Sequence, residues 1–387
     1  MSSRQKPERI LFINHEYPPT GGGAATVTRT LVTRLHQAGY PVALLTGTIT
    51  GSCSAITVEF PVFQVNSRRR SPWEGTYREF IRFFLKSIFL LCRIRKEFRP
   101  TIAFAFFSIP GGLVALVQKG LFGVPYIVSI RGADIPGFQF DKGLSLFHTI
   151  LRPLIKLVLW QADQVHVNSL RLQNLTRQII SNGEIILLPN GIEPALTKID
   201  STYESPLKLL FVGRLSPQKN LSIVLKALAQ MDTEHRAQLI FNIVGDGPER
   251  QHLEQMVSRL KITDNVRFNS WVDRQELPGI FQASDILLLP SLDEGMPNAA
   301  LEAINYGCLV IGSKAAQICT AEFSVDSNWL IENGRDVQTW QTAIMRAVNN
   351  PELVKQDAEL IRQLVLTKLG WEKLIPDYIK LIVGREN

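Results

Sequence analysis

The chain has 387 residues, of which 45% are hydrophobic and 20% are charged, and its formal net charge is +7. This length is too great for one ordinary hydrophobic core and fits two domains, while the composition excludes a disordered chain. The four cysteines form no C-x-x-C pair and have no histidines at zinc-binding spacing, so we interpret them as scattered thiols in a reducing compartment. No apolar run reaches the roughly 18 residues of a spanning helix, and the run at 10–13 is too short for a secretory signal. We expect a cytoplasmic protein.

Short β-branched runs alternate with longer amphipathic segments along the chain. Strands are predicted in the first half at 10–14, 42–46, 101–106, 126–130, 164–168 and 185–189, and in the second half at 207–213, 239–245, 266–268, 285–290 and 309–313. Apolar strands that alternate with helices are typical of parallel sheets covered on both faces. The turn-rich segment 190–206 separates the two series. The sequence therefore predicts two tandem, doubly wound, Rossmann-like α/β domains facing each other across a cleft, at 1–195 and 205–369.

The basic excess is concentrated in the first half, between residues 67 and 100. Cations are interleaved there with aromatic and aliphatic residues, in a pattern that predicts an amphipathic helix over 75–97. Such a helix suggests docking on the inner, anionic face of a membrane, in which case the acceptor of any transferred group would be linked to lipid. The alternative is a helix with a packed apolar face and a solvated basic face. The sequence leaves both open and slightly favours the second. No nucleic-acid recognition motif is present.

Loops that follow strands in the second half carry the candidate chemistry, because ligands of such sheets bind beyond the carboxyl ends of the strands. The first loop begins at Gly213, which lets the backbone turn tightly, and presents Arg214 and Lys219. Two cations in one loop suit a diphosphate leaving group, although a solvated basic loop would look the same.

In a later loop, Trp271 is a candidate wall for a nucleotide base and equally an aromatic core residue.

A second loop contains Gly245, Asp246 and Gly247 after a predicted strand. The two glycines mark a sharp turn. Either this turn brings the backbone close to a ligand or its role is structural, and the sequence leaves the two open.

The most informative loop follows the predicted strand at 285–290. Pro297 and Asn298 open a helix there, and the amide groups at a helix start attract anions. Gly295 permits close backbone approach. Glu294 lies in the loop, and Glu302 lies two helical turns further on, up to about 12 Å away along the axis. Two carboxylates at that reach can bind separate hydroxyl groups of one extended ligand, such as a donor with a sugar at one end and a ribose at the other.

Taken in order, these segments resemble the retaining glycosyltransferases of family 4. The resemblance rests on FVGRLSPQKNL, IVGDGPER, DILLLPSLDEGMPNAALEAINYG and LVIGS in the second half, and on EYPPTGGGAATV in the first. The glutamate pair with seven intervening residues is its most specific element. The family has the two-domain glycosyltransferase B fold, in which the last helix, here 370–387, packs back on the N-terminal domain.

The resemblance also implies roles for individual residues. Catalytic contacts are assigned to Glu294, Arg214, Lys219, Asp134 and Arg131. Arg131 stands where many relatives have histidine, which leaves its role open between phosphate and acceptor. Asp134 could hold the acceptor or the sugar, and a structural role in its loop is as consistent. Donor binding is assigned to Gly22, Gly23, Gly213, Gly245, Asp246, Gly247, Gly295, Met296, Pro297, Asn298 and Glu302.

The expected activity is transfer of a hexose from a nucleotide-diphosphate sugar to an acceptor hydroxyl, in the synthesis of a cell-surface polysaccharide or glycolipid. The resemblance implies retention of configuration without a metal or a bound cofactor, with electrostatic stabilisation of the leaving diphosphate. Two alternatives remain: a nucleotide-sugar epimerase on the same fold and a non-catalytic nucleotide-sugar-binding subunit. A dinucleotide oxidoreductase is excluded, because the glycines at 21–23 do not complete G-x-G-x-x-G. The base, the sugar, the acceptor and the oligomeric state are left open.

Overall fold

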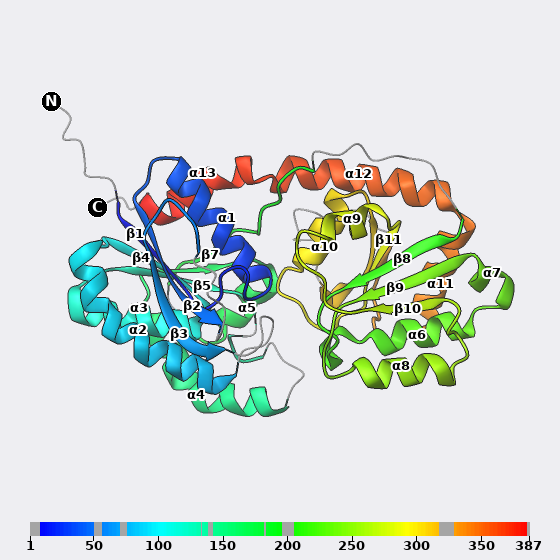
Figure 1. Ribbon diagram of the computed structural model, residues 1–387, viewed down its shortest axis with the longest axis horizontal. Coiled ribbons are helices and arrows are strands. Elements are labelled where there is room, and N and C mark those ends of the chain that lie inside the picture. Colours follow the sequence, from blue (N-terminus) through cyan, green and yellow to red (C-terminus); the bar gives the residue numbers. More distant parts are fainter. Residues whose placement is uncertain are drawn as a thin grey trace. The chain divides into compact units, whose positions relative to one another are not determined.

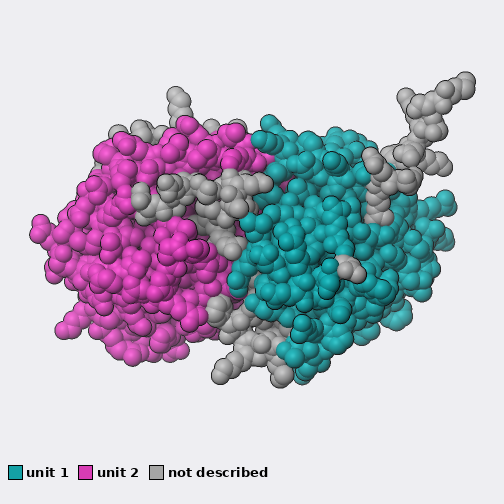
Figure 2. All heavy atoms as spheres, turned by 180° about the vertical axis from the view of Figure 1, so that it is seen from behind, with its two compact units in different colours: residues 1–138, 142–190, 372–387 teal, residues 139–141, 191–371 magenta. Residues whose placement is uncertain are grey.

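A computed structural model gives the structure of the chain and describes residues 8–49, 56–69, 76–132, 134–137, 142–181, 183–195, 205–316 and 329–384. The chain forms two compact units (Figure 2). Unit 1 comprises Met1–Phe138, Lys142–Asn190 and Glu372–Asn387. Unit 2 comprises Gln139–Asp141 and Gly191–Trp371. Each unit is an open, twisted, parallel sheet with helices on both faces (Figure 1), so the predicted two parallel-sheet α/β domains are confirmed.

The sheet of unit 1 has seven strands in the order β3-β2-β1-β4-β5-β6-β7, and every pairing is parallel. The strands are β1 (Ile10–Asn14), β2 (Val42–Ile49), β3 (Val62–Arg69), β4 (Ile102–Phe106), β5 (Tyr126–Ile130), β6 (Gln164–Val167) and β7 (Ile185–Leu187). The sequence did not predict β3. Its side chains alternate between buried and exposed, as expected of an edge strand, and its last residues belong to the basic run that suggested a helix.

Helices cover both faces of this sheet. On one face lie α2 (Tyr77–Glu97), α3 (Leu113–Phe122), α4 (Lys142–Gln161) and α5 (Leu170–Arg177), which share one hydrophobic core with alternate strand residues. On the other face lie α1 (Gly23–Gln37) and α13 (Trp371–Val383) (Figure 1). A short, kinked turn, η1 (Phe107–Gly112), links β4 to α3.

The sheet of unit 2 has six strands in the order β10-β9-β8-β11-β12-β13, again all parallel. They are β8 (Leu207–Val212), β9 (Leu239–Val244), β10 (Val266–Asn269), β11 (Ile286–Leu289), β12 (Leu309–Ser313) and β13 (Leu330–Ile331). From β8 the chain first builds outward to β9 and β10, and then returns to place β11 on the other side of β8. In parallel α/β sheets, such a reversal of strand order marks the ligand-binding crevice.

The helices of unit 2 are α6 (Leu221–Gln230), α7 (Thr233–Ala237), α8 (Arg250–Arg259), α9 (Leu277–Gln282), α10 (Asn298–Asn305), α11 (Val337–Asn349) and α12 (Pro351–Leu369), and a short 3-10 turn, η2 (Pro217–Lys219), follows β8. The segments at which the chain enters and leaves this unit, near Ile192 and Trp371, are hydrogen-bonded to each other. The Ile192 amide donates to the Leu369 carbonyl at 2.8 Å, and the Trp371 amide donates to the Ile192 carbonyl at 3.1 Å.

The final helix, α13, belongs to unit 1. The Tyr378 hydroxyl donates to the Pro189 carbonyl at 3.1 Å, and its ring lies 5.4 Å from that of His166 on β6. Throughout the described ranges, no helix has both the length and the apolar character required to cross a bilayer.

Candidate active site

The loops after β8 and β9 are locked together by backbone contacts. The Leu215 amide donates to the Asp246 carbonyl at 2.8 Å, and the Glu249 amide donates to the Leu215 carbonyl at 3.0 Å. Gly245 adopts a φ of +143°, and a Cβ atom there would lie 2.0 Å from the carbonyl oxygen of Gly213. Glycine is therefore required at this turn, for both its conformation and its close approach to the neighbouring loop. The structural role that the sequence allowed for this turn is thus present.

The loops after β8 and β11 meet at the reversal of strand order. The Leu292 amide donates to the Gln218 carbonyl at 2.8 Å, and the Gln218 side chain donates to the Asp293 carbonyl at 2.6 Å. Because these bonds fix η2 against the loop before α10, they also fix the side chain that follows Gln218.

That side chain is Lys219, whose ammonium group contacts Glu294 Oε1. The Ser291 hydroxyl donates to the same carboxylate oxygen at 2.7 Å. The two side chains are largely but not fully buried, with exposed fractions of 21% for Lys219 and 12% for Glu294. The structure therefore holds a cation and a carboxylate together where the strand order reverses. Arg214, the other predicted cation, is exposed in the same loop.

Helix α10 begins at Asn298, directly after Pro297, and no side chain of its own caps it. Glu302 lies on this helix and contacts Arg274, which comes from the loop after β10. Burial raises the pKa of Glu302, and the Arg274 guanidinium opposes that rise. Trp271, in the same loop as Arg274, is 42% exposed, so it is not the aromatic core residue that the sequence allowed.

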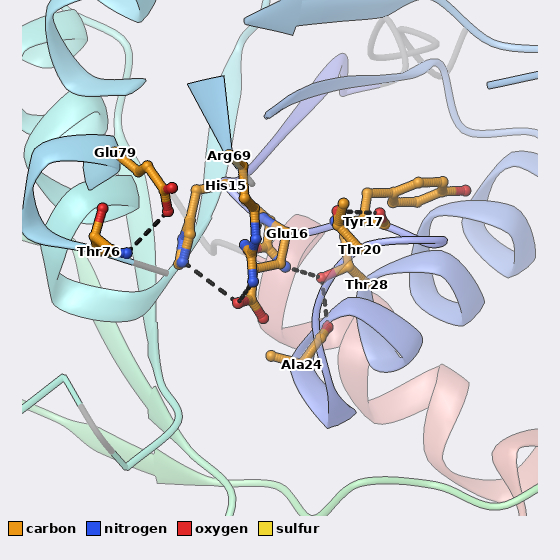
Figure 3. Close-up of polar contacts among 10 residues, drawn as sticks. His15, Glu16, Tyr17, Thr20, Ala24, Thr28, Arg69, Thr76 and Glu79 are labelled. Atoms are coloured by element: carbon orange, nitrogen blue, oxygen red, sulfur yellow. Dashed lines mark hydrogen bonds and ion pairs between the residues drawn. The ribbon is translucent and has the colours of Figure 1, made fainter. Parts of the chain in front are cut away.

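In unit 1, the Glu16 carboxylate lies beside the glycine-rich turn, and Figure 3 shows it facing His15 and Arg69. Glu16 follows β1 and accepts from Arg69 Nη2 at 3.1 Å. Gly21 has a φ of +90°, and a Cβ atom there would lie 2.6 Å from Glu16 Oε2. The side chain of Glu16 thus lies under the turn that leads into α1, which begins at Gly23.

The electrostatics of this cluster follow from its burial. Although burial by itself would raise the pKa of Glu16, the charge and the hydrogen bond of the neighbouring Arg69 hold it below its usual value. His15 Nε2 lies 3.7 Å from Glu16 Oε1, and its ring contacts those of Phe80 and Phe107. Burial lowers the pKa of His15 to about 4, so its imidazole is neutral near pH 7.

Asp134 is buried and binds backbone amides of its own loop and of η1. One carboxylate oxygen accepts from the amides of Arg131 and Gly132, each at 2.9 Å, and the other accepts from the Ser108 amide at 2.7 Å. Burial raises the pKa of Asp134, and these donors oppose the rise. These contacts agree with a structural role for Asp134 in its loop. A contact of Asp134 with the acceptor or the sugar stays a prediction.

Arg131 is also turned inward. Its guanidinium stacks on Phe106 at 4.6 Å, and Nη1 donates to Asn190 Oδ1 at 2.7 Å. It therefore joins the end of β5 to the last residue of unit 1 before the chain enters unit 2.

The predicted site residues thus form two groups. In unit 2 the structure brings together the loops that carry Gly213, Lys219, Gly245 and Glu294, and it places Glu302 against Arg274. In unit 1, Gly22 and Gly23 begin α1, while Arg131 and Asp134 follow β5. Sequence reasoning assigned no role to Glu16, Ser291 or Arg274. It placed Arg69 in the basic run 67–100, and the structure shows that this side chain is buried, with 3% exposed. Across the part of the chain that the structure describes, no three or more histidine, cysteine or acidic side chains are grouped to hold a metal ion.

Residues 22–191 match the model of the glycosyl transferase 4-like domain, and residues 194–363 match the model of the glycosyl transferases group 1. The two matches together span most of the chain. The protein therefore belongs to the group 1 glycosyltransferases and is a glycosyltransferase.

Known proteins agree with this placement. The chain is 24% identical over 372 residues to N-acetyl-alpha-D-glucosaminyl L-malate synthase of Bacillus anthracis, covering 93% of both chains. Sucrose-phosphate synthase from Thermosynechococcus elongatus superimposes with a TM-score of 0.82 at 19% identity, over 97% of this chain and 98% of that one. Anabaena Alr3699/HepE, solved with UDP and glucose, gives 0.73 at 17% identity, over 97% and 99%. These structures show that the fold is the glycosyltransferase B type.

Proposed function

We propose that the crevice between β8 and β11 binds the diphosphate of a nucleotide-sugar, and that the protein transfers a hexose from it to an acceptor hydroxyl. The observation that carries this proposal is the contact of Lys219 with Glu294 where the strand order reverses. A fixed cation at that place suits the developing negative charge of a diphosphate, because a preorganised charge costs no reorganisation during the reaction. Its carboxylate partner suits hydroxyl groups of the donor sugar.

We assign the other roles from the family resemblance. Arg214 joins Lys219 at the diphosphate, the backbone from Gly295 to Asn298 approaches the phosphates and the sugar, and Glu302 binds the ribose. In the chemical step, the anomeric carbon–oxygen bond to the diphosphate breaks while the acceptor oxygen bonds to the same face of the sugar. The acceptor proton passes to the leaving diphosphate oxygen. The configuration is retained, and the cationic side chains supply the stabilisation without a metal.

We propose further that unit 1 receives the acceptor and that the segment 67–100 brings this unit to an anionic membrane surface. The acceptor is then a lipid-linked carbohydrate of a cell-surface polysaccharide or glycolipid. Support comes from α2, which carries Arg78, Arg82 and Lys86 in its first half and Arg93, Arg95 and Lys96 in its second. Arg69 takes no part in this contact, because it is buried.

The test of the donor site is a thermal-shift screen against uridine, guanosine and adenosine diphosphates and their sugars. We expect one nucleotide to raise the midpoint of unfolding, and its sugar to be consumed only when an acceptor is added. Consumption without acceptor would instead indicate an epimerase. No shift with any of the nucleotides would contradict the donor site.

Two further measurements test the mechanism. The anomeric coupling constant of the product, read by proton NMR, reports whether configuration is retained. Transfer in the presence of EDTA reports whether a metal is needed, and a loss of transfer that Mg²⁺ or Mn²⁺ restores would overturn the metal-free mechanism.

A further inference from the structure

The outward side of α2 carries a stripe of exposed apolar residues. Ile81, Leu85 and Phe89 are exposed, and Phe89 reaches 83%. Each of them stands two positions from a buried residue of the same helix, which is about 200° around the helix axis. The buried residues are Glu79, Phe83, Ser87, Leu91 and Ile94. The exposed stripe therefore points directly away from the core of unit 1, on a helix whose other apolar side already packs against the sheet.

Helix α4 repeats this arrangement. Leu157 and Trp160 are exposed, and each stands two positions from a buried neighbour, Leu159 or Val158 respectively. Ile150, two helical turns before Leu157 and on the same side, is 68% exposed. The sequence analysis did not predict an exposed apolar stripe on this helix. Its composition alone does not show which of its apolar residues are buried and which are exposed.

The two stripes belong to one surface. Helices α2, α3 and α4 cover the same face of the unit 1 sheet (Figure 1). Helix α2 packs on α3, α3 packs on α4, and both α2 and α4 contact η1. Between them, Leu121 near the end of α3 is 58% exposed. Exposed apolar side chains on three neighbouring helices exceed what scattered surface residues explain and mark an interaction site.

The charges around these stripes have one prevailing sign. In α4, the exposed Arg152 and the exposed Lys156 flank the stripe, and the helix sequence contains no acidic residue. On α2, the acidic residues are Glu79, which is buried at the helix start, and Glu97, which is paired with Arg93 at 2.7 Å. The surface is thus apolar along its ridges and cationic beside them, which is the complement of an anionic lipid interface.

We propose that the outer faces of α2 and α4 together form the membrane-docking surface, with Phe89 and Trp160 as its two apolar anchors. This inference rests on the proposed membrane contact of segment 67–100, which it extends to a second helix, and it is independent of the donor site. Two anchored helices fix the orientation of unit 1 on the bilayer. A single anchored helix would allow unit 1 to rotate about the axis of that helix.

The experiment measures binding of the full-length protein to vesicles of phosphatidylcholine with and without phosphatidylglycerol. Three double variants are compared: Leu157→Asp with Trp160→Asp on α4, Leu85→Asp with Phe89→Asp on α2, and, as the matched control, Leu360→Asp with Leu364→Asp. The control residues are 54% and 38% exposed on α12 of unit 2. We expect either face variant to lower binding to anionic vesicles at least tenfold, and the control to bind as the wild type does.

Thermal melting confirms that the variants fold, and donor-induced thermal shifts report the active site separately. Normal binding by the α4 variant, with loss in the α2 variant, would refute the two-helix surface and leave the contact of 67–100 in place. Absence of wild-type binding would refute both membrane proposals without affecting the donor site. If the wild type sedimented as a dimer that the face variants dissociate, the surface would instead be an interface between copies of this chain.

Discussion

The ammonium group of Lys219 contacts the carboxylate of Glu294, and this contact links side chains of the two loops that follow the central strands of unit 2. The Ser291 hydroxyl donates to the same carboxylate oxygen at 2.7 Å, so the pair is held in place before any ligand arrives. A binding site whose charges are already oriented avoids the cost of ordering flexible side chains on binding.

Substitution of Lys219 or Glu294 by alanine is expected to lower transfer by about 10²- to 10³-fold, the usual effect of removing one electrostatic contact to a developing charge. The fold should persist, because neither side chain belongs to the hydrophobic core. Lys314→Ala is the matched control, since Lys314 also pairs with a glutamate of unit 2 but both partners are exposed. Steady-state turnover and thermal melting are measured on all three proteins. Near-normal turnover in both site variants would remove the assignment.

Gly245→Ala is expected to destabilise unit 2 by about 1–3 kcal/mol, because the backbone there is in a left-handed region and the added methyl group meets a carbonyl oxygen. Donor affinity should fall with it, since the loops after β8 and β9 must separate. Gly279→Ala is the control, because a Cβ atom there has no neighbour within 4 Å. Urea unfolding compares the two variants. Equal stability would show that the loops are not locked.

The buried Arg69–Glu16 pair should be sensitive to loss of one partner. Arg69→Met is expected to cost about 3–5 kcal/mol, because it leaves a buried carboxylate without its cation. Arg93→Met breaks an Arg–Glu pair that is exposed in the same unit, and it should cost less than about 1 kcal/mol. Chemical denaturation at neutral pH measures both. A small effect of Arg69→Met would mean that the glycine-rich turn is held by other contacts.

Acid should destabilise unit 1 through His166. Burial and the nearby Arg131 charge lower the pKa of this histidine to about 3, against about 6.5 in the unfolded chain. Between these values the unfolded state binds a proton that the folded state does not. The titration of His166 therefore leaves the free energy of unfolding unaffected above about pH 6.5. Below that pH the free energy of unfolding falls by about 1.4 kcal/mol per pH unit.

The test compares the unfolding free energy of the wild type and of His166→Phe at about pH 7 and about pH 5. The variant should be less stable near neutrality, because Ser129 and the Leu188 carbonyl lose their partner, and it should lose less stability in acid. His235→Gln serves as the control, since the partly exposed His235 has its pKa raised by Asp232 and contributes no such acid loss. An acid loss in His166→Phe as large as in the wild type would contradict the assignment.

The sequence was sufficient for the fold because the central strands of both sheets are apolar on both faces, as Leu209 and Leu210 on β8 show. It was insufficient at the edge of the first sheet. Strand β3 buries only alternate residues. Its final arginines follow the same pattern in the sequence as the basic residues after them, so the sequence analysis grouped them together. The burial of Arg69 depends on Glu16, which lies 53 positions away in the chain. No local pattern encodes such a pairing.

The site divides in the same way. The positions of Lys219 and Glu294 could be predicted because each follows a recognisable strand, and parallel strand ends share one edge of the sheet. The Arg274–Glu302 pair could not, because it joins a loop and a helix that are 28 positions apart, and no local pattern indicates which cation meets Glu302. The outward stripe of α4 was also missed, since only the packing of Val158 and Leu159 shows which side of that helix faces the core.

The return of α13 to the first sheet has a consequence for biosynthesis. Tyr378 covers His166 from the far end of the chain, so the fold of the N-terminal half cannot be completed until the ribosome has added the last helix. A truncation after α12 would leave Val167 packed on one face of β6 and His166 uncovered on the other. Nascent chains are then expected to need protection from aggregation until α13 has been synthesised, and fragments that stop near residue 191 should be poor substitutes for the first domain.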